Sequence, residues 1–314
     1  MKSILSTLSL RFKHKPECVA AIGVFDGLHK GHTYILDKVI AKAKRLNVKS
    51  LLVSFNPHPR IFYKKRFTGY ITALEEKSRI LEGTSLDYFW CMNFNKRLSS
   101  MSAETFINYI SRYFNIRKII VGEDFRFGYK AKSNINDLRI IGKKNDISIL
   151  IIKKRRLKNL VIKSSLIRSL IKEHNFKSVR ELLGRPYFIS GLVKKGAAVG
   201  RKRLGIPTIN LEVDDKVLPP CGVYLSRVRY REKDYAAISN LGRAPTVQKR
   251  KTLLETHIFN FKKNIYKDLA KVVFIKMLRK EKKFSSLDKL KKQINKDIKS
   301  AKKIFSDHNI LYLP

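Results

Sequence analysis

The chain has 314 residues, 44% of them hydrophobic, and its 68 Lys and Arg against 25 Asp and Glu give a formal net charge of +43. This length and apolar content are typical of a packed globular protein with two domains of ordinary size. No apolar run approaches the roughly 20 residues that a membrane-spanning helix needs, so we expect no such helix.

The first half of the chain alternates between predicted strands and helices. Residues 18–25 form a short apolar run followed by a glycine-rich turn, and a helical pattern of apolar residues begins near His32. Further runs predict strands at residues 50–55, 89–94, 118–122 and 147–152, and helices at residues 102–113 and 137–144. This alternation predicts a Rossmann-like α/β domain, with a parallel sheet and helices on both faces.

The pattern changes at Gly184, which suits a helix C-cap after two short helical stretches. We therefore expect two domains, residues 1–184 and residues 185–314. Short runs rich in Val, Ile and Tyr predict a small antiparallel barrel, with strands at residues 187–193, 222–230, 235–239, 254–261 and 271–278. Apolar residues at 3- and 4-residue steps then predict a terminal helix, capped by Ser285 and Asp288.

The segment that joins the first strand to the first helix indicates phosphate chemistry. It reads G-V-F-D-G-L-H-K-G-H over residues 23–32, with Gly31 between His29 and His32. A helix N-terminus offers free N–H groups and a positive dipole end, and two imidazoles there can face one phosphate chain. We expect this turn to stabilise the charge that develops during attack on an α-phosphorus.

A second motif, L-G-I-P-T-I-N-L at residues 204–211, indicates a metal and phosphate site. Thr208 and Asn210 are two residues apart in an extended segment, so they face the same way, and Mg²⁺ prefers such oxygen ligands. Glycines in and before this motif allow a loop backbone to approach phosphates, at Gly196, Gly200 and Gly205. On a later strand, the carboxylate of Glu255 can accept the proton of an alcohol during phosphoryl transfer.

These segments, in this order, resemble the bacterial bifunctional riboflavin kinase/FAD synthetases. The resemblance runs from about Val19 to the last helix, through H-K-G-H (29–32), F-N-P-H-P (55–59), V-G-E-D-F-R-F-G (121–128), K-S-S-L-I-R (163–168), P-T-I-N (207–210) and L-E-T-H (254–257). It implies a first domain that is an FMN adenylyltransferase and a second that is a riboflavin kinase. The implied substrates are riboflavin, FMN and ATP, and the implied cofactor is Mg²⁺.

The resemblance also implies the residues of the two sites. His29 and His32 are the expected catalytic residues of adenylyl transfer, and Glu255 is the expected base of the kinase. Other ATP and phosphate contacts of the first site are expected at Gly23, Phe25, Asp26, Gly31, Ser164, Ser165 and Arg168. Flavin and nucleotide contacts are expected at Asn56, Asp124, Phe125 and Phe127, with core burial an equal alternative for both phenylalanines. In the kinase, phosphate contacts are expected at Gly196, Gly200, Gly205, Thr208 and Asn210, the last two also as Mg²⁺ ligands.

We expect two further residues of the second domain to have no role in catalysis or ligand binding. His257 shares the strand face of Glu255, and we expect it to form a structural hydrogen bond. Arg279 is expected to be a solvated charge, outside the site.

Two alternatives remain open from the sequence. Lys163 and Leu166 depart from the usual Ser-Ser-Thr-x-Ile-Arg block, which leaves open a riboflavin kinase whose first domain has lost adenylylation. The charge leaves open a basic nucleic-acid-binding protein, although the lysines are spread over the whole chain and no nucleic-acid-binding motif occurs. We expect small-molecule substrates, and no specific nucleic acid, membrane or obligate protein partner. Three scattered cysteines without a metal or disulfide pattern indicate the cytoplasm.

Overall fold

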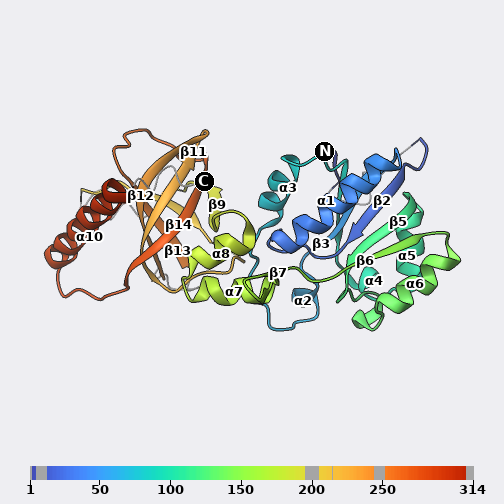
Figure 1. Ribbon diagram of the computed structural model, residues 1–314. Coiled ribbons are helices and arrows are strands. Elements are labelled where there is room, and N and C mark those ends of the chain that lie inside the picture. Colours follow the sequence, from blue (N-terminus) through green and yellow to red (C-terminus); the bar gives the residue numbers. More distant parts are fainter. Residues whose placement is uncertain (1, 5–12, 195–204, 214, 244–251, 309–314) are drawn as a thin grey trace. The chain divides into compact units, whose positions relative to one another are not determined.

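The computed structural model describes residues 2–4, 13–194, 205–213, 215–243 and 252–308. Its internal contacts divide the chain into two compact units, Met1–Ser164 and Ser165–Pro314 (Figure 1). Each unit has its own sheet and its own buried core. Among the described helices, none is long and apolar enough to cross a membrane.

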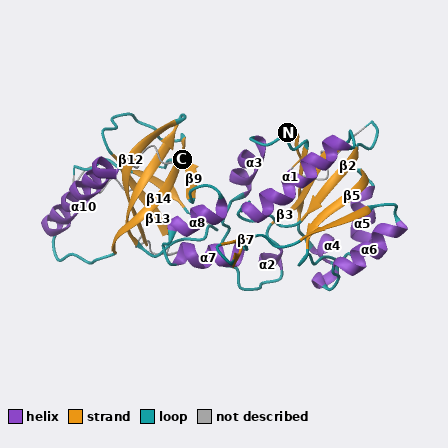
Figure 2. Ribbon diagram, viewed as in Figure 1, coloured by secondary structure: helices purple, strands orange, loops and turns teal. Residues whose placement is uncertain are grey.

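The first unit is built on a six-stranded parallel sheet (Figure 2). Its strands are β1 (Lys2–Ile4), β2 (Glu17–Ile22), β3 (Lys49–Asn56), β4 (Tyr88–Asn93), β5 (Asn115–Gly122) and β6 (Ser148–Ile152). They lie in the order β1-β4-β3-β2-β5-β6, so after β4 the chain returns to the other side of β2. The carboxyl ends of β2 and β5 flank this reversal, which is where open α/β sheets bind their ligands.

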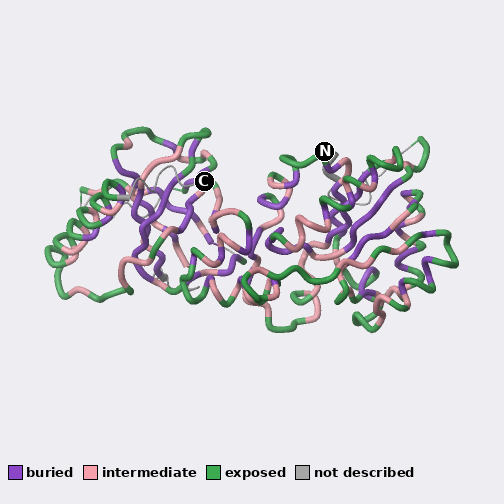
Figure 3. Tube along the Cα trace, viewed as in Figure 1, coloured by how far each residue is buried: buried purple, intermediate pink, exposed green. Residues whose placement is uncertain are grey.

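Helices cover both faces of this sheet, and a two-stranded hairpin follows it. The helices are α1 (Lys30–Arg45), α2 (Pro59–Phe62), α3 (Leu74–Glu82), α4 (Lys96–Ser99), α5 (Ala103–Ser111), the 3-10 turn η2 (Tyr129–Ala131) and α6 (Ile135–Lys144). The hairpin is formed by β7 (Arg156–Leu157) and β8 (Leu160–Val161). Along β2, Ala20 packs in the core with α5 and α6, whereas Ala21 packs in the core with α1 and α3. Burial on both faces explains why β2 is apolar from Cys18 to Ile22, after an exposed Glu17, as the buried strands of Figure 3 illustrate.

In its described residues, the second unit is an antiparallel barrel with three helices. α7 (Ser164–Lys172) and α8 (Phe176–Leu183) precede the barrel strands β9 (Phe188–Leu192), β10 (Ile209–Glu212), β11 (Gly222–Tyr230), β12 (Lys233–Arg243), β13 (Thr252–Ile258) and β14 (Leu269–Lys280). The strand order is β10-β13-β12-β11-β14-β9, and Lys194, just after β9, bridges to Asn210 on β10. The terminal helix α10 (Leu287–His308) packs Ala301 and Phe305 onto Leu225 of the barrel.

The predicted fold class is therefore confirmed in both halves. Gly184 ends α8 in the left-handed conformation (φ 75°), as its position predicted. The division between the compact units nevertheless falls at the first residue of α7 rather than after α8, because α8 packs on the barrel: the rings of Phe176 and Phe274 stack with 5.5 Å between centroids. The boundary at Gly184, as a division between two activities, stays a prediction.

The predicted cap of α10 is wrong by one residue. The hydroxyl that accepts from the backbone N–H of Lys289 belongs to Ser286 (3.2 Å), whereas the hydroxyl of Ser285 accepts from the Lys289 ammonium (3.1 Å). Because the helix begins at Leu287, Ser286 is the residue in the capping position.

Candidate active sites

The loop between β2 and α1 (residues 23–29), which we call the histidine loop, brings both predicted histidines to the start of the helix. His29 is the N-cap of α1, and its Nδ1 accepts a hydrogen bond from the backbone N–H of His32 (3.2 Å). The two imidazole rings stack with 3.6 Å between centroids; His29 is buried and His32 is half-buried. The first turn of α1 carries no acidic residue, so the chain places no carboxylate there to compensate the positive end of the helix dipole.

Two glycines, one in this loop and one at the start of α1, lie close to side chains of the predicted site. A Cβ on Gly23 would lie 3.0 Å from the ring of Phe25, and a Cβ on Gly31 would lie 3.2 Å from the imidazole of His29. A side chain at either position would therefore require a residue of the predicted site to shift by a few tenths of an ångström.

Asp26 anchors the loop to the segment that precedes α3. Its side chain is buried, and Oδ1 accepts hydrogen bonds from the backbone N–H groups of Ile71 (3.0 Å) and Thr72 (3.1 Å). The described contacts thus give Asp26 an anchoring role, and a direct contact with ATP phosphates stays a prediction.

The K-S-S-L-I-R block begins beside the same loop. The hydroxyl of Ser164 donates to the backbone oxygen of Asp26 (2.9 Å), although 138 residues separate them. Ser165 and Arg168 follow on α7, in the second compact unit, where Ser165 is exposed and Arg168 is half-buried. The structure therefore brings Ser164 to the histidine loop, whereas the places of Ser165 and Arg168 in this site stay predictions.

An aromatic cluster surrounds the predicted flavin contacts at the ends of β3 and β5. Asn56 ends β3, and the hydroxyl of Tyr70 lies 3.4 Å from its Oδ1. Beside it, Phe55 contacts Phe94 (5.8 Å between ring centroids) and Phe106 (6.1 Å). These rings provide an apolar wall at the carboxyl edge of the sheet.

The residues after β5 divide into one core residue and two accessible ones. Phe127 is buried in the core with Phe106, so core burial, one of its two expected roles, describes it. Phe125 stacks on Phe127 (5.1 Å) and is half-buried, which leaves part of its ring exposed. The side chain of Asp124 is 66% exposed, with a carboxylate oxygen 3.2 Å from the Lys154 ammonium.

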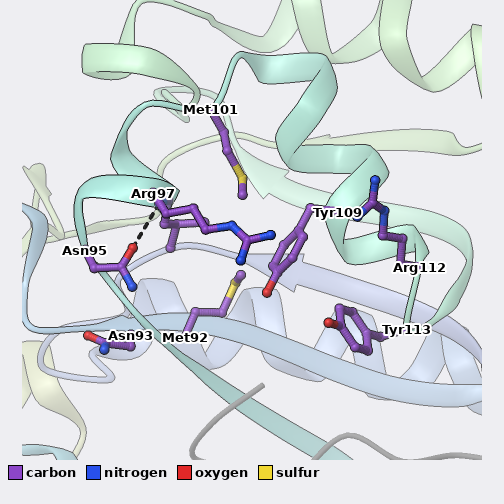
Figure 4. A pocket seen from close by; sticks show the side chains of 9 residues that line it. Met92, Asn93, Asn95, Arg97, Met101, Tyr109, Arg112 and Tyr113 are labelled. Carbon is purple, nitrogen blue, oxygen red and sulfur yellow. Dashed lines mark hydrogen bonds between the residues drawn. The ribbon is translucent and has the colours of Figure 1, made fainter. Parts of the chain in front are cut away.

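A cavity of about 330 Å³ lies at the carboxyl end of β4, beside α4 and α5 (Figure 4). Arg97, Met101 and Tyr109 point into it, and its wall also includes Met92, Asn93, Asn95, Leu98, Arg112 and Tyr113. None of the residues predicted for either site lines this cavity, so it supports neither of them.

The predicted kinase residues form a row across three strands of the barrel. Asn210 on β10 lies directly opposite Glu255 on β13, and Glu255 lies opposite Asn240 on β12. Residues that pair directly across antiparallel strands project to the same face of the sheet. Leu254 and Thr256 alternate with this row and are fully buried, whereas Glu255 is half-buried.

Two observations bear on the predicted ligands of this row. The Oδ1 of Asn210 is buried and has no hydrogen-bond partner among the described residues. An unsatisfied buried carbonyl oxygen beside a carboxylate fits the oxygen ligands that Mg²⁺ prefers. Thr208 is half-buried just before β10, and its orientation toward a metal stays a prediction.

The remaining predictions for the second unit have mixed outcomes. His257 does form a structural hydrogen bond, from its Nδ1 to the backbone oxygen of Pro207 (2.7 Å), which ties β13 to the P-T-I-N segment. Gly205 has a left-handed backbone (φ 71°) and open space around it. Gly196 and Gly200 lie outside the described residues.

The expectation that Arg279 is a solvated charge is wrong. Its Nε and Nη2 lie 2.9 and 2.8 Å from Oδ2 of Asp297 on α10, and their side chains are only 16% and 9% exposed. The sequence prediction failed because Asp297 lies on a separate element, 18 residues further along the chain.

Sequence reasoning also missed Lys77 on α3. This lysine is only 4% exposed, and its ammonium donates to the backbone oxygen of Val24 in the histidine loop (2.8 Å). Its neighbours Glu75, Glu76 and Arg79 are charged, so the local pattern is that of an exposed helix face and gives no signal of burial.

Both halves of the chain are similar to known proteins. A family model described as FAD synthetase matches residues 11–166, and one described as riboflavin kinase matches residues 183–305. A "bifunctional riboflavin kinase/FMN adenylyltransferase" from Buchnera aphidicola subsp. Schizaphis graminum is 37% identical, over 98% of this chain and 99% of its own. The protein of the same description from Escherichia coli K12 is 31% identical, over 97% and 98% of the two chains.

One solved structure is similar over nearly the whole chain. It is described as a macrolide-efflux protein from Streptococcus pneumoniae, with a TM-score of 0.81, 27% sequence identity and coverage of 96% of this chain and 98% of its own. This similarity supports the fold.

Proposed function

The chain belongs to the bifunctional riboflavin kinase/FMN adenylyltransferase family, and we propose that the residues described above divide its two reactions between the barrel and the parallel-sheet unit. The enzyme phosphorylates riboflavin with ATP to give FMN, and joins FMN to a second ATP to give FAD and pyrophosphate. The assignment of each reaction to particular side chains is the proposal.

In the barrel, Glu255 is the catalytic base. Its carboxylate accepts the proton of the ribityl hydroxyl while that oxygen forms a bond to the γ-phosphorus of ATP. The bond between the γ-phosphorus and the β,γ-bridging oxygen breaks, and ADP leaves. Asn210 and Thr208 provide oxygen ligands for the Mg²⁺ that accompanies ATP. When bound, this cation neutralises phosphate charge.

In the parallel-sheet unit, the histidine loop stabilises charge on ATP. A phosphate oxygen of FMN attacks the α-phosphorus, the bond to the α,β-bridging oxygen breaks, and pyrophosphate leaves. His29, His32 and the N-terminus of α1 face the charge that develops on these oxygens, because they offer donors and a positive dipole end. Phe125 and Asp124 contact the flavin or nucleotide.

This proposal rests on one observation: the two groups of predicted site residues lie on separate sheets. The stacked His29 and His32 lie at the strand-order reversal of the first unit, and Asn210 and Glu255 share one face of the second. Two independent sites predict that FMN is released or transferred as a true intermediate. We also propose that the enzyme works in the cytoplasm, because its three cysteines are unpaired.

A chromatographic time course tests the whole scheme. Purified protein is incubated with riboflavin, ATP and Mg²⁺, and in parallel with FMN, ATP and Mg²⁺. FMN should appear first and then decline as FAD accumulates, and added FMN should yield FAD without a lag. The role proposed for the histidine loop would be overturned if riboflavin gave FMN but neither reaction gave FAD.

A further inference from the structure

Lys77 is a buried lysine directly beneath the histidine loop. The loop carbonyl of Val24 accepts two hydrogen bonds, one from the Lys77 ammonium (2.8 Å) and one from the hydroxyl of Ser54 on β3 (2.8 Å). The same ammonium lies 3.2 Å from the Ser54 hydroxyl oxygen. Lys77 is 4% exposed and Ser54 is fully buried, so this arrangement is closed to solvent.

Such an arrangement is unfavourable for stability alone. Removing an ammonium from water costs several kcal/mol, and a neutral carbonyl and a hydroxyl return only part of that cost. Burial has the larger effect and lowers the pKa of Lys77, whereas the nearby Asp26 carboxylate raises it and favours the charged form. A methionine would fill the same space without this cost, so the charge itself requires an explanation.

The backbone of the histidine loop gives a reason for the charge of Lys77. Phe25 (φ 50°), Gly27 (φ 92°) and Leu28 (φ 39°) all have left-handed backbones, which non-glycine residues rarely adopt. Such a loop keeps one conformation only when its surroundings hold it there. Asp26 holds its middle through the N–H groups of Ile71 and Thr72, and Lys77 holds its start through Val24.

We propose that Lys77 is a positioning residue for adenylyl transfer: it fixes the histidine loop from beneath and keeps a positive charge in the dry interior behind the phosphate-binding turn. The inference rests on the function proposed for that loop. Because the ammonium is withdrawn from solvent, its field is screened less than that of a surface lysine. It acts through the loop and touches no substrate.

Three variants separate the charge of Lys77 from its packing. Lys77→Met removes the charge at similar volume, Lys77→Arg keeps the charge, and Ser54→Ala removes one partner of Val24 while leaving Lys77 in place. Each is assayed for FAD formation from FMN and ATP, for FMN formation from riboflavin by the intact barrel, and for thermal unfolding.

We expect Lys77→Met to lower kcat for FAD formation by about 10- to 100-fold, by analogy with residues that orient metal ligands without binding the metal. KM for FMN and the kinase activity should change less than about twofold, and the unfolding temperature should not fall. Lys77→Arg should recover part of the lost kcat, and Ser54→Ala should lie between wild type and Lys77→Met.

Two outcomes would overturn the inference. One is a Lys77→Met enzyme with wild-type kcat; the other is a fall in kcat that Lys77→Arg does not relieve and that follows the loss of folded protein. A His29→Asn variant assayed beside them distinguishes an error in the proposed site from an error in the role of Lys77 alone. If His29→Asn also keeps full FAD formation, the proposed site is wrong, whereas its loss beside an active Lys77→Met rejects only the role of Lys77.

Discussion

Asn210 and Glu255 face each other across neighbouring antiparallel strands, so a buried amide oxygen without a hydrogen-bond partner among the described residues lies beside a carboxylate. The two residues are 45 positions apart in sequence, and the pairing of β10 with β13 alone brings them together. In the kinase site proposed above, Asn210 is the cation ligand and Glu255 the proton acceptor, a combination that suits phosphoryl transfer to an alcohol.

Replacing Glu255 by glutamine should stop the kinase and spare the adenylyltransferase. The amide has nearly the same shape but cannot accept the proton, so we expect kcat for FMN formation to fall by about 10²- to 10⁴-fold. FAD formation from added FMN should be unchanged, which also shows that the protein is folded. A Glu255→Gln enzyme that phosphorylates riboflavin at the wild-type rate would show that another group takes the proton.

Replacing Asn210 by leucine should separate activity from stability. The Oδ1 of Asn210 has no hydrogen bond to lose among the described residues, so we expect the free energy of unfolding to change by less than about 1 kcal/mol, or to rise. Kinase activity should nevertheless fall, and the Mg²⁺ concentration for half-maximal rate should increase. Urea unfolding and a Mg²⁺ titration measure the two effects. A strongly destabilised but Mg²⁺-insensitive variant would assign Asn210 a structural role instead.

Most of the fold follows from local patterns. The runs of residues 18–25 and 118–122 predicted β2 and β5 because the buried stretches of both strands are apolar, whereas Glu17, Asn115 and Arg117 at their starts are exposed. The elements that sequence reasoning missed are short or polar: α2 and α4 have four residues each, and α3 carries charges around most of its surface. Too few periodic apolar residues remain in such segments to give a signal.

The candidate sites follow from sequence only where the residues are local. His29 and His32 share one turn, and their contact is implied by their spacing. The contacts of Lys77 with Val24, of Ser164 with Asp26 and of Arg279 with Asp297 depend on packing between distant elements. The periodicity of a single sequence does not indicate such pairs. Burial of Lys77 is also not expected, because burying a charged side chain is costly.

Replacing His29 by asparagine should remove catalysis and keep the helix cap. Asparagine is among the best N-cap residues and can accept from the same backbone N–H, so the unfolding temperature should hold. FAD formation should fall by about 10²- to 10³-fold if the imidazole stabilises the transition state, and FMN formation should not change. His29→Ala provides the comparison, with a further loss of about 1 kcal/mol of stability from the missing cap.

The cysteines should differ sharply in reactivity. Burial raises the pKa of the Cys18 thiol to about 12 and that of Cys91 to about 11, whereas Cys221 is half-buried. At pH 8, iodoacetamide should therefore modify Cys221 first, and the other two only after unfolding, as mass spectrometry of the peptides can show.

The same shifts predict a direction for stability at high pH. Cys18 and Cys91 bind their protons more tightly in the folded protein, so their contribution is complete below the ordinary thiol value of 9.0 and is lost as pH rises toward about 11 to 12. Cys91→Ala should therefore show a smaller loss of stability between pH 8 and pH 10 than the wild type. An equal loss in both proteins would contradict the assignment of this proton to Cys91.

Breaking the ion pair between Arg279 and Asp297 should destabilise the second unit strongly. Arg279 on β14 reaches α10 through two nitrogen–oxygen contacts of 2.9 and 2.8 Å, and Gln293 donates to the other carboxylate oxygen of Asp297 (2.7 Å). Removing one partner leaves the other charge poorly solvated, so Arg279→Met and Asp297→Leu should each cost about 3 to 5 kcal/mol. The two units must be followed separately, with flavin kinase activity reporting the barrel and FAD formation reporting the parallel sheet.

The double variant Arg279→Met/Asp297→Leu decides what the pair contributes. If it only satisfies two buried charges, apolar side chains of similar size should restore stability to within about 1 kcal/mol of the wild type. If it also holds α10 in register against the barrel, the double variant should regain stability but not kinase activity, because Ala301 and Phe305 would no longer be held in one position against Leu225. We expect the second result, since a buried ion pair that adds little net stability is most useful where it selects one packing over its alternatives. A double variant with full kinase activity would reduce the pair to a local stabiliser of α10.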